Sequence, residues 1–101
     1  MEVQIDNKMV ENAAEVRISV RLTPRELSQV FLSGDTLIRL PVEHAICEDT
    51  APVLRDTVFL SELAECRQGY RRRFAQAAAA TAFAASVREQ LNAAATQLER
   101  L

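Results

Sequence analysis

The residues best suited to chemistry gather in one segment, Glu43 to Asp49, where a histidine and a cysteine lie among three carboxylates. Imidazole, thiolate and carboxylate groups bind zinc, but a structural zinc site normally needs four ligands in paired short spacings. His44 and Cys47 form one such pair, and Cys66 is the sole distant thiol. We therefore expect no metal here, but a solvated loop with one buried cysteine.

A nucleophilic site is the next chemistry to weigh, because His44 could activate either cysteine as a thiolate if the fold brought them together. Apart from the presence of these residues, no pattern supports it. The chain lacks the serine-hydrolase elbow, the dinucleotide glycine pattern and the H-E-x-x-H motif, and its 2 glycines are too few for a phosphate-binding loop. We expect no enzyme activity and no cofactor.

A basic group with interleaved aromatics is the strongest sign of a binding surface. The four arginines between residues 67 and 73 have no acid among them, and on a helix Arg67 and Arg71 would share one face. Arginine beside aromatic rings can contact phosphates and stack on bases. The alternative is a solvated face whose arginines pair with Glu62 or Glu65. The candidate contacts with a partner or with nucleic acid are Arg67, Tyr70, Arg71, Arg72, Arg73 and Phe74.

The element expected to carry this group is a long helix. Residues 70 to 101 contain no Gly and no Pro and are rich in Ala, so they predict an uninterrupted helix of about 48 Å. Gly69 would cost roughly 1 kcal/mol inside a helix and predicts a kink or a break between two helices. Numbered in sevens from Leu63, the inward positions are apolar except at Arg73.

A helix of this length is longer than a small sheet can cover, so part of its apolar face should need another chain. Alanine lets helix axes approach closely, which favours an antiparallel helix pair across a two-fold axis. We predict a homodimer, with a hetero-complex as the alternative. The predicted pairing seam consists of Ala77, Ala80, Ala84, Val87, Leu91, Ala94 and Leu98.

The first part of the chain predicts a hairpin. Residues 15–22 alternate strictly between apolar and polar side chains, which indicates a half-buried strand. Val3, Ile5, Met9 and Val10 predict a partner strand, with residues 11–14 as the turn.

A short helix should follow at once. Thr23 can cap it, Pro24 suits its first position and Glu26 can reach back to the cap, while Ser33 and Gly34 end it. Its apolar face is expected at Leu27, Val30 and Phe31.

Two further segments complete the first part of the chain. Residues 38–42 alternate as a strand, with Pro41 favouring an edge or a strand end. Residues 53–60 are ambiguous between strand and helix, and we favour a strand before Ser61.

Composition limits the class of protein. The 101 residues fit one domain, and a hydrophobic fraction of 49% with 26% charged residues is typical of globular domains. The longest uncharged stretch, residues 74–87, is too short to span a bilayer, so we expect no membrane partner. Two well-separated cysteines predict reduced, small core residues, and the amino-terminus shows no targeting signal, so we expect a cytoplasmic protein.

Together these patterns predict an α+β fold: an antiparallel sheet of three or four strands, one short helix and a long C-terminal helix. Residues 1–60 form the small α+β part, and residues 61–101 form the long helix or helix pair of the same domain. We expect a small non-enzymatic interaction protein whose target is a larger protein complex. By size and lack of chemistry it is similar to many small inhibitors encoded by phages and mobile elements, including those aimed at nucleic-acid defence. The alternatives are a nucleic-acid-binding regulator and a structural subunit of a larger assembly.

Overall fold

The computed structural model describes residues 1–41, 43–46 and 56–100. Its first two strands, β1 (Glu2–Val10) and β2 (Ala13–Arg21), form the predicted antiparallel hairpin. The turn between them holds two residues and is shorter than predicted, and Glu11 adopts a positive φ of 55° in it. Alternate residues of β2 point into the core, which confirms the predicted half-buried strand. The buried apolar side chains of β2 are Ala14, Val16, Ile18 and Val20.

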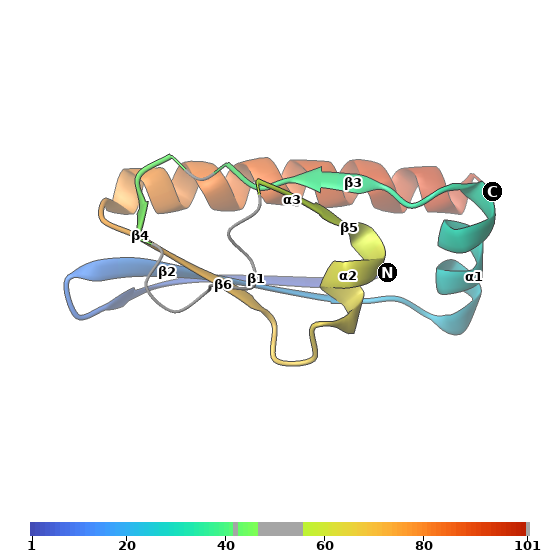
Figure 1. Cartoon of the computed structure of the whole chain (residues 1–101), viewed down its shortest axis with the longest axis horizontal. Helices are drawn as coiled ribbons and strands as arrows, with labels where there is room; N and C mark the ends of the chain where they lie inside the picture. Colours follow the sequence, from blue (N-terminus) through green and yellow to red (C-terminus); the bar gives the residue numbers. More distant parts are fainter. Residues whose placement is uncertain (42, 47–55, 101) are drawn as a thin grey trace.

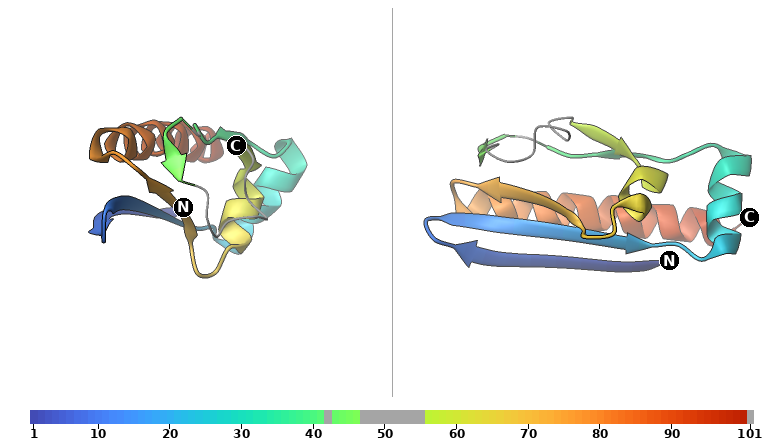
Figure 2. Two further views of the ribbon diagram at one scale, coloured as in Figure 1. Left: turned by 60° about the vertical axis from the view of Figure 1, so that its left-hand side comes forward. Right: turned by 60° about the horizontal axis from the view of Figure 1, so that its bottom comes forward.

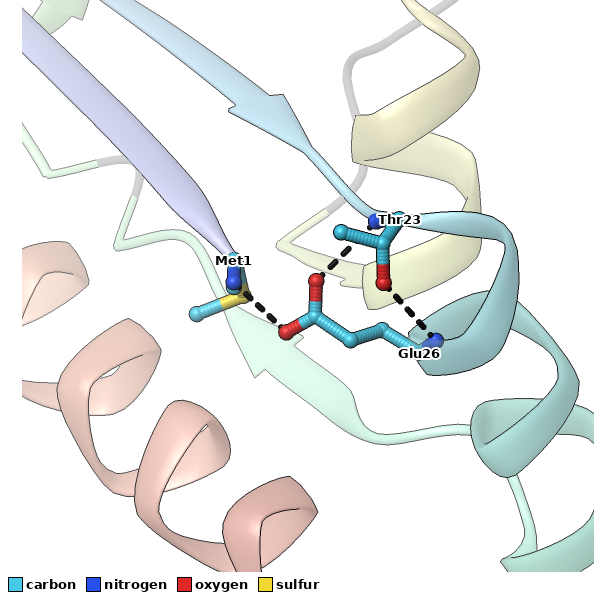
Figure 3. Close-up of polar contacts among 3 residues, drawn as sticks. All are labelled: Met1, Thr23 and Glu26. Carbon is cyan, nitrogen blue, oxygen red and sulfur yellow. Dashed lines mark hydrogen bonds and ion pairs between the residues drawn. The ribbon is translucent and has the colours of Figure 1, made fainter.

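Helix α1 (Pro24–Ser33) begins where the sequence predicts. The Thr23 hydroxyl accepts a hydrogen bond from the Glu26 amide at 3.1 Å, and a Glu26 carboxylate oxygen accepts one from the Thr23 amide at 3.0 Å. The other carboxylate oxygen lies 2.6 Å from the N-terminal ammonium of Met1, so the cap also holds the start of β1 (Figure 3). The ammonium and the Thr23 amide lower the pKa of the Glu26 carboxyl. Gly34 ends the helix with a φ of 94°.

Two short strands, β3 (Leu37–Arg39) and β5 (Thr57–Phe59), pair antiparallel as a second sheet. This confirms a strand before Ser61 for the described part of that segment; residues 53–55 lie outside the described residues. The strand predicted over 38–42 ends earlier, before Pro41. Helix α2 (Leu60–Glu65) follows β5 directly, with the Glu62 carboxylate accepting from the Phe59 amide at 3.1 Å.

The predicted helix over residues 70–101 is wrong in its first part. Residues Tyr70–Phe74 form strand β6, and helix α3 runs over Ala77–Glu99, 23 residues in all. β6 pairs with β2 on one side and with the two-residue strand β4 (Ala45–Ile46) on the other. Gly69 is neither a kink nor a helix break, since it turns the chain into β6 with a φ of 81°. Helix propensity is a weak preference, and here pairing with β2 and burial of alternate side chains override it.

The strands of the main sheet lie in the order β1-β2-β6-β4, and α3 runs along one face of it (Figure 1). The same helix also contacts β3, so the core lies between α3 and strands of both sheets, with α1 closing one end (Figure 2). This α+β arrangement confirms the predicted fold class. The segment 61–101 is more than a helix, because it supplies a strand to the middle of the main sheet. No helix in the described ranges is long and apolar enough to cross a bilayer.

Candidate interaction surface

Strand β6 divides the predicted basic group, because successive side chains of a strand point to opposite faces. Arg72 points toward α3 and is buried, whereas Arg71 is exposed and Arg73 half-buried on the opposite face. Arg67 is exposed in the loop between α2 and β6. The prediction that Arg67 and Arg71 share one helix face is therefore wrong.

Arg72 is a core residue, with 2% of its surface exposed. Its guanidinium donates to the Leu40 carbonyl oxygen at 3.2 Å and to the Tyr70 hydroxyl, and it lies 5.6 Å from the centre of the Phe83 ring. A buried cation must be hydrogen-bonded, and these contacts join β6 to the segment after β3 and to α3. Arg72 holds the fold together and is not available to an external phosphate.

The two aromatics of the basic group are also buried. Tyr70 is 5% exposed and Phe74 is 1% exposed, and the Phe74 ring packs on Phe83 with 4.9 Å between the ring centres. Neither ring can stack on a base while the domain is folded. The arrangement of arginines interleaved with accessible aromatics, on which the nucleic-acid prediction depended, is absent from β6.

The face of the main sheet away from α3, which we call the outer sheet face, carries charges of both signs. The β1–β2 register places Glu2 opposite Arg21, Asp6 opposite Arg17, and Lys8 opposite Glu15. Cross-strand pairs of opposite charge stabilise a sheet. Arg73 lies 3.7 Å from Glu15, and Arg17 donates to the Gln68 carbonyl oxygen at 2.8 Å. Arg17 and Arg71 lie directly opposite each other on β2 and β6 as a like-charge pair. The outer sheet face is therefore of mixed charge and not uniformly basic.

A hollow of about 440 Å³ lies between the outer sheet face and the loop after α2. Its lining includes Arg21, Arg67 and the exposed thiol of Cys66. The prediction that Cys66 is a small core residue is therefore wrong. His44, the base considered for a cysteine nucleophile, lines a different hollow beside α3.

The segment predicted to be a solvated loop is described only in part. Glu43 and His44 are described, whereas Cys47, Glu48 and Asp49 lie outside the described residues. Within the described residues, no group of three His, Cys, Asp or Glu side chains is placed to hold a metal ion.

The predicted pairing seam lies largely inside the domain. Ala80, Val87, Leu91 and Ala94 are at most 2% exposed, and Leu98 is 7% exposed. Ala84 is half-buried and Ala77 exposed. Because the chain's own sheets cover this face, the helix does not need a second chain to bury it. Pairing through the seam would require the sheets to leave the helix.

Several of the large exposed apolar side chains lie on α1 and on the β3–β5 sheet that follows it in the chain. Phe31 is 67% exposed and Leu32 88% exposed at the end of α1, and Leu37 (54%) lies directly opposite Phe59 (44%) across the two strands. We call these four residues the α1–β3 apolar surface. Single exposed apolar residues are ordinary on soluble proteins, but grouped ones often mark interaction sites.

Sequence reasoning missed this surface because it assigned Phe31 to the buried face of α1. Only Val30 is fully buried there, at 1% exposed, while Leu27 reaches 36%. A usable signal was present: four apolar residues among positions 27–32 are more than one face of a short helix can bury.

Neither a protein-family model, nor a characterised protein, nor a solved structure matches this chain at a significant level.

Proposed function

We propose that the protein is a small non-enzymatic interaction module that binds a partner protein through the α1–β3 apolar surface. The exposure of Phe31, Leu32, Leu37 and Phe59 carries the proposal. Large aromatic and aliphatic side chains that stand free in solution provide the buried anchors of protein interfaces once a partner covers them.

The geometry around this surface favours a docking role. Leu37 and Phe59 are a cross-strand pair, so the backbone fixes their relative position before any partner binds. Asp35, in the connection from α1 to β3, accepts hydrogen bonds from the Ser61 amide at 3.3 Å and from the Ser61 hydroxyl. A preorganised apolar surface loses little conformational entropy on binding.

The target we propose is the larger protein complex expected from the sequence, which the module would inhibit or redirect in the cytoplasm. The nucleic-acid alternative has less support. Of the four arginines in the basic group, Arg72 is buried and Arg73 pairs with Glu15, and both aromatics lie in the core.

The test compares two double variants with the wild type, each immobilised and exposed to lysate of the source cells. Phe31→Gln/Leu32→Gln removes two apolar anchors, whereas Arg67→Gln/Arg71→Gln removes two exposed cations and leaves the apolar surface intact. We expect the wild type and the arginine variant to bind the same lysate protein. The apolar variant should fail to bind it. With that protein purified, the apolar variant should bind about tenfold or more weakly by calorimetry.

The reverse pattern, in which the arginine variant alone loses the partner, would overturn the proposal and favour an acidic target. Circular dichroism of both variants checks that they stay folded, which we expect because all four side chains are exposed.

A further inference from the structure

Strand β1 is a long edge strand whose far side is open. It lies at the end of the sheet order, and no other strand in the described ranges pairs with it there (Figure 2). Its nine residues contain no Pro and no Gly, and their register with β2 runs from Glu2 to Val10 without a bulge. Edge strands of natural proteins are usually short, bulged or covered, because free amides and carbonyls attract other strands.

Another edge of the same protein shows such a cover. On β3, the Gln90 side chain from α3 donates to the Arg39 carbonyl oxygen at 2.8 Å and accepts from the Arg39 amide at 2.7 Å. The side-chain amide thus takes the place of a neighbouring strand. The open edge of β1 has no such cover from the residues the structure describes.

The side chains of β1 also leave apolar surface uncovered. Val3 and Ile5 face α3 and are half-buried, but Met9 on the same face is 65% exposed. A large apolar side chain is therefore exposed on the strand that has the open edge.

We propose that the open edge of β1 binds the same edge of a second copy of this chain, antiparallel across a two-fold axis at Asn7. In this register Asp6 lies opposite Lys8 of the second copy, and Lys8 opposite its Asp6. On the other face Ile5 lies opposite Met9 of the second copy, so each exposed Met9 gains an apolar neighbour. The two four-stranded sheets become one continuous sheet of eight strands.

The charge order of the outer sheet face continues across this axis. Within one chain, Asp6 already lies opposite Arg17 and Lys8 opposite Glu15. In the dimer, the Asp6 row of one copy joins the Lys8 row of the other, so the joined row reads Arg17, Asp6, Lys8, Glu15, with signs that alternate across the axis. Opposite charges on directly opposed residues stabilise strand pairing, so two such pairs beside the axis favour this register.

Neighbouring registers are less favourable. A two-fold axis at Asp6 would place Asp6 against itself, and an axis at Lys8 would place Lys8 against itself. An axis at Ile5 pairs Glu2 with Lys8 of the second copy and is the main competitor. It places Met9 opposite Met1, whose ammonium is already bound by Glu26. The axis at Asn7 alone combines the two unlike pairs beside it with the contact of Ile5 and Met9.

The dimer rests on one strand pair, so its interface is small, and its dissociation constant should be on the order of micromolar. It is independent of the proposed function, because the α1–β3 apolar surface contributes no residue to it. Loss of partner binding in the Phe31→Gln/Leu32→Gln variant with dimerisation intact separates the two ideas.

A charge swap tests the inference by sedimentation equilibrium over a concentration series. Asp6→Lys alone and Lys8→Asp alone each create two like-charge pairs, so each should dimerise more weakly by about tenfold or more. An equimolar mixture of the two variants restores both unlike pairs and should form heterodimers. The double variant Asp6→Lys/Lys8→Asp restores both unlike pairs across the axis and should dimerise more tightly than either single variant. Recovery in the mixture also shows that both single variants are folded.

Glu2→Lys is the matched control, since Glu2 has no charged partner in the proposed register. A wild type that stays monomeric at several hundred micromolar would overturn the proposal. Equal dissociation constants for the wild type, Asp6→Lys and Lys8→Asp would also overturn it. Weakening by Glu2→Lys but not by Asp6→Lys would move the axis to Ile5 and contradict the register at Asn7.

Discussion

Helix α1 and strand β6 are short elements of the same chain whose conformations have different causes. Helix α1 is specified by neighbouring residues: Thr23 and Glu26 exchange hydrogen bonds, and Gly34 ends the helix. Strand β6 lies in sequence that favours helix, and it is a strand because β2 pairs with it and the core receives Tyr70, Arg72 and Phe74. Local hydrogen bonds can set a boundary, but burial can reverse a propensity of a few tenths of a kcal/mol per residue.

Substitutions in β6 should remove tertiary contacts and therefore lower the free energy of unfolding strongly. Substitutions at the ends of α1 should remove only local interactions and lower it modestly. The largest effect is expected at Arg72. Arg72→Ala should lower the free energy of unfolding by about 3 kcal/mol, because it leaves the Leu40 carbonyl and the Tyr70 hydroxyl without this donor and opens a cavity beside Phe83. Urea unfolding followed by circular dichroism measures it.

Its neighbour Arg71 provides the matched control, since it is one residue away on the exposed face. Arg71→Ala should change stability by less than about 0.5 kcal/mol. Equal losses in the two variants would contradict the assignment of Tyr70–Phe74 as a strand.

A smaller effect is expected at Gly69, which turns the chain into β6. Its φ is 81°, and an added Cβ would lie 2.8 Å from the Ser19 hydroxyl oxygen and 3.0 Å from Nε of Arg17. Gly69→Ala should therefore cost about 2 kcal/mol from strain and crowding together. Thermal unfolding of the variant provides the measurement.

A substitution at Gly34 separates the cost of backbone strain from the cost of steric crowding. Its φ is 94°, but an added Cβ would meet no atom within 4 Å, so Gly34→Ala should cost only the strain, about 1 kcal/mol. Ser19→Ala combined with Gly69→Ala should recover part of the loss by removing the crowded oxygen. A loss at Gly34 as large as that at Gly69 would exclude the steric explanation.

An effect smaller than that at Gly69 is expected at the α1 cap. Glu26→Gln should destabilise the protein by about 1 kcal/mol at pH 7, because it weakens the cap and removes the ion pair with Met1. The folded protein holds the pKa of the Glu26 carboxyl below its ordinary value of 4.5. The contribution of the charged carboxylate is therefore fully present above that value and is lost as the pH falls through the lower, folded pKa.

Urea unfolding of the wild type and Glu26→Gln at pH 7 and at about pH 3 measures this dependence. We expect the difference between the two proteins to shrink at the lower pH. A difference that stays constant between these pH values would mean that the carboxylate charge does not contribute.

The fold could be predicted from the sequence wherever one periodicity or one cap decided the structure. The alternation of residues 15–22 and the Thr23–Glu26 box each predicted an element that the structure contains. The start of α3 could not be predicted in this way, because two patterns overlap there. The helical seam includes Tyr70, Arg73 and Ala77, and the buried face of a strand would include Tyr70, Arg72 and Phe74. Both patterns fit the sequence equally well. Gly69 was the local clue, but a glycine before a helix and a glycine before a strand are alike in sequence.

The candidate surface was less predictable than the fold. The arginines between residues 67 and 73 are adjacent in the chain, yet one lies in a loop, one in the core and two on the outer sheet face. The α1–β3 apolar surface joins residues from α1, β3 and β5, and its exposure depends on which faces other elements cover. Sequence patterns state which residues are apolar, but they do not state which apolar residues remain uncovered.

Local patterns of residues were enough to specify the α+β class, the first hairpin, the capped helix and the apolar stripe of the C-terminal helix. These follow from interactions within a few residues and from the period of apolar side chains, which the printed order of residues already contains. The tertiary structure alone decided that Tyr70–Phe74 is a strand, that Arg72 is buried and that the stripe of α3 packs inside its own chain. These outcomes depend on contacts between elements far apart in the chain, such as β1 with α3, whose free energy of burial exceeds the local preference.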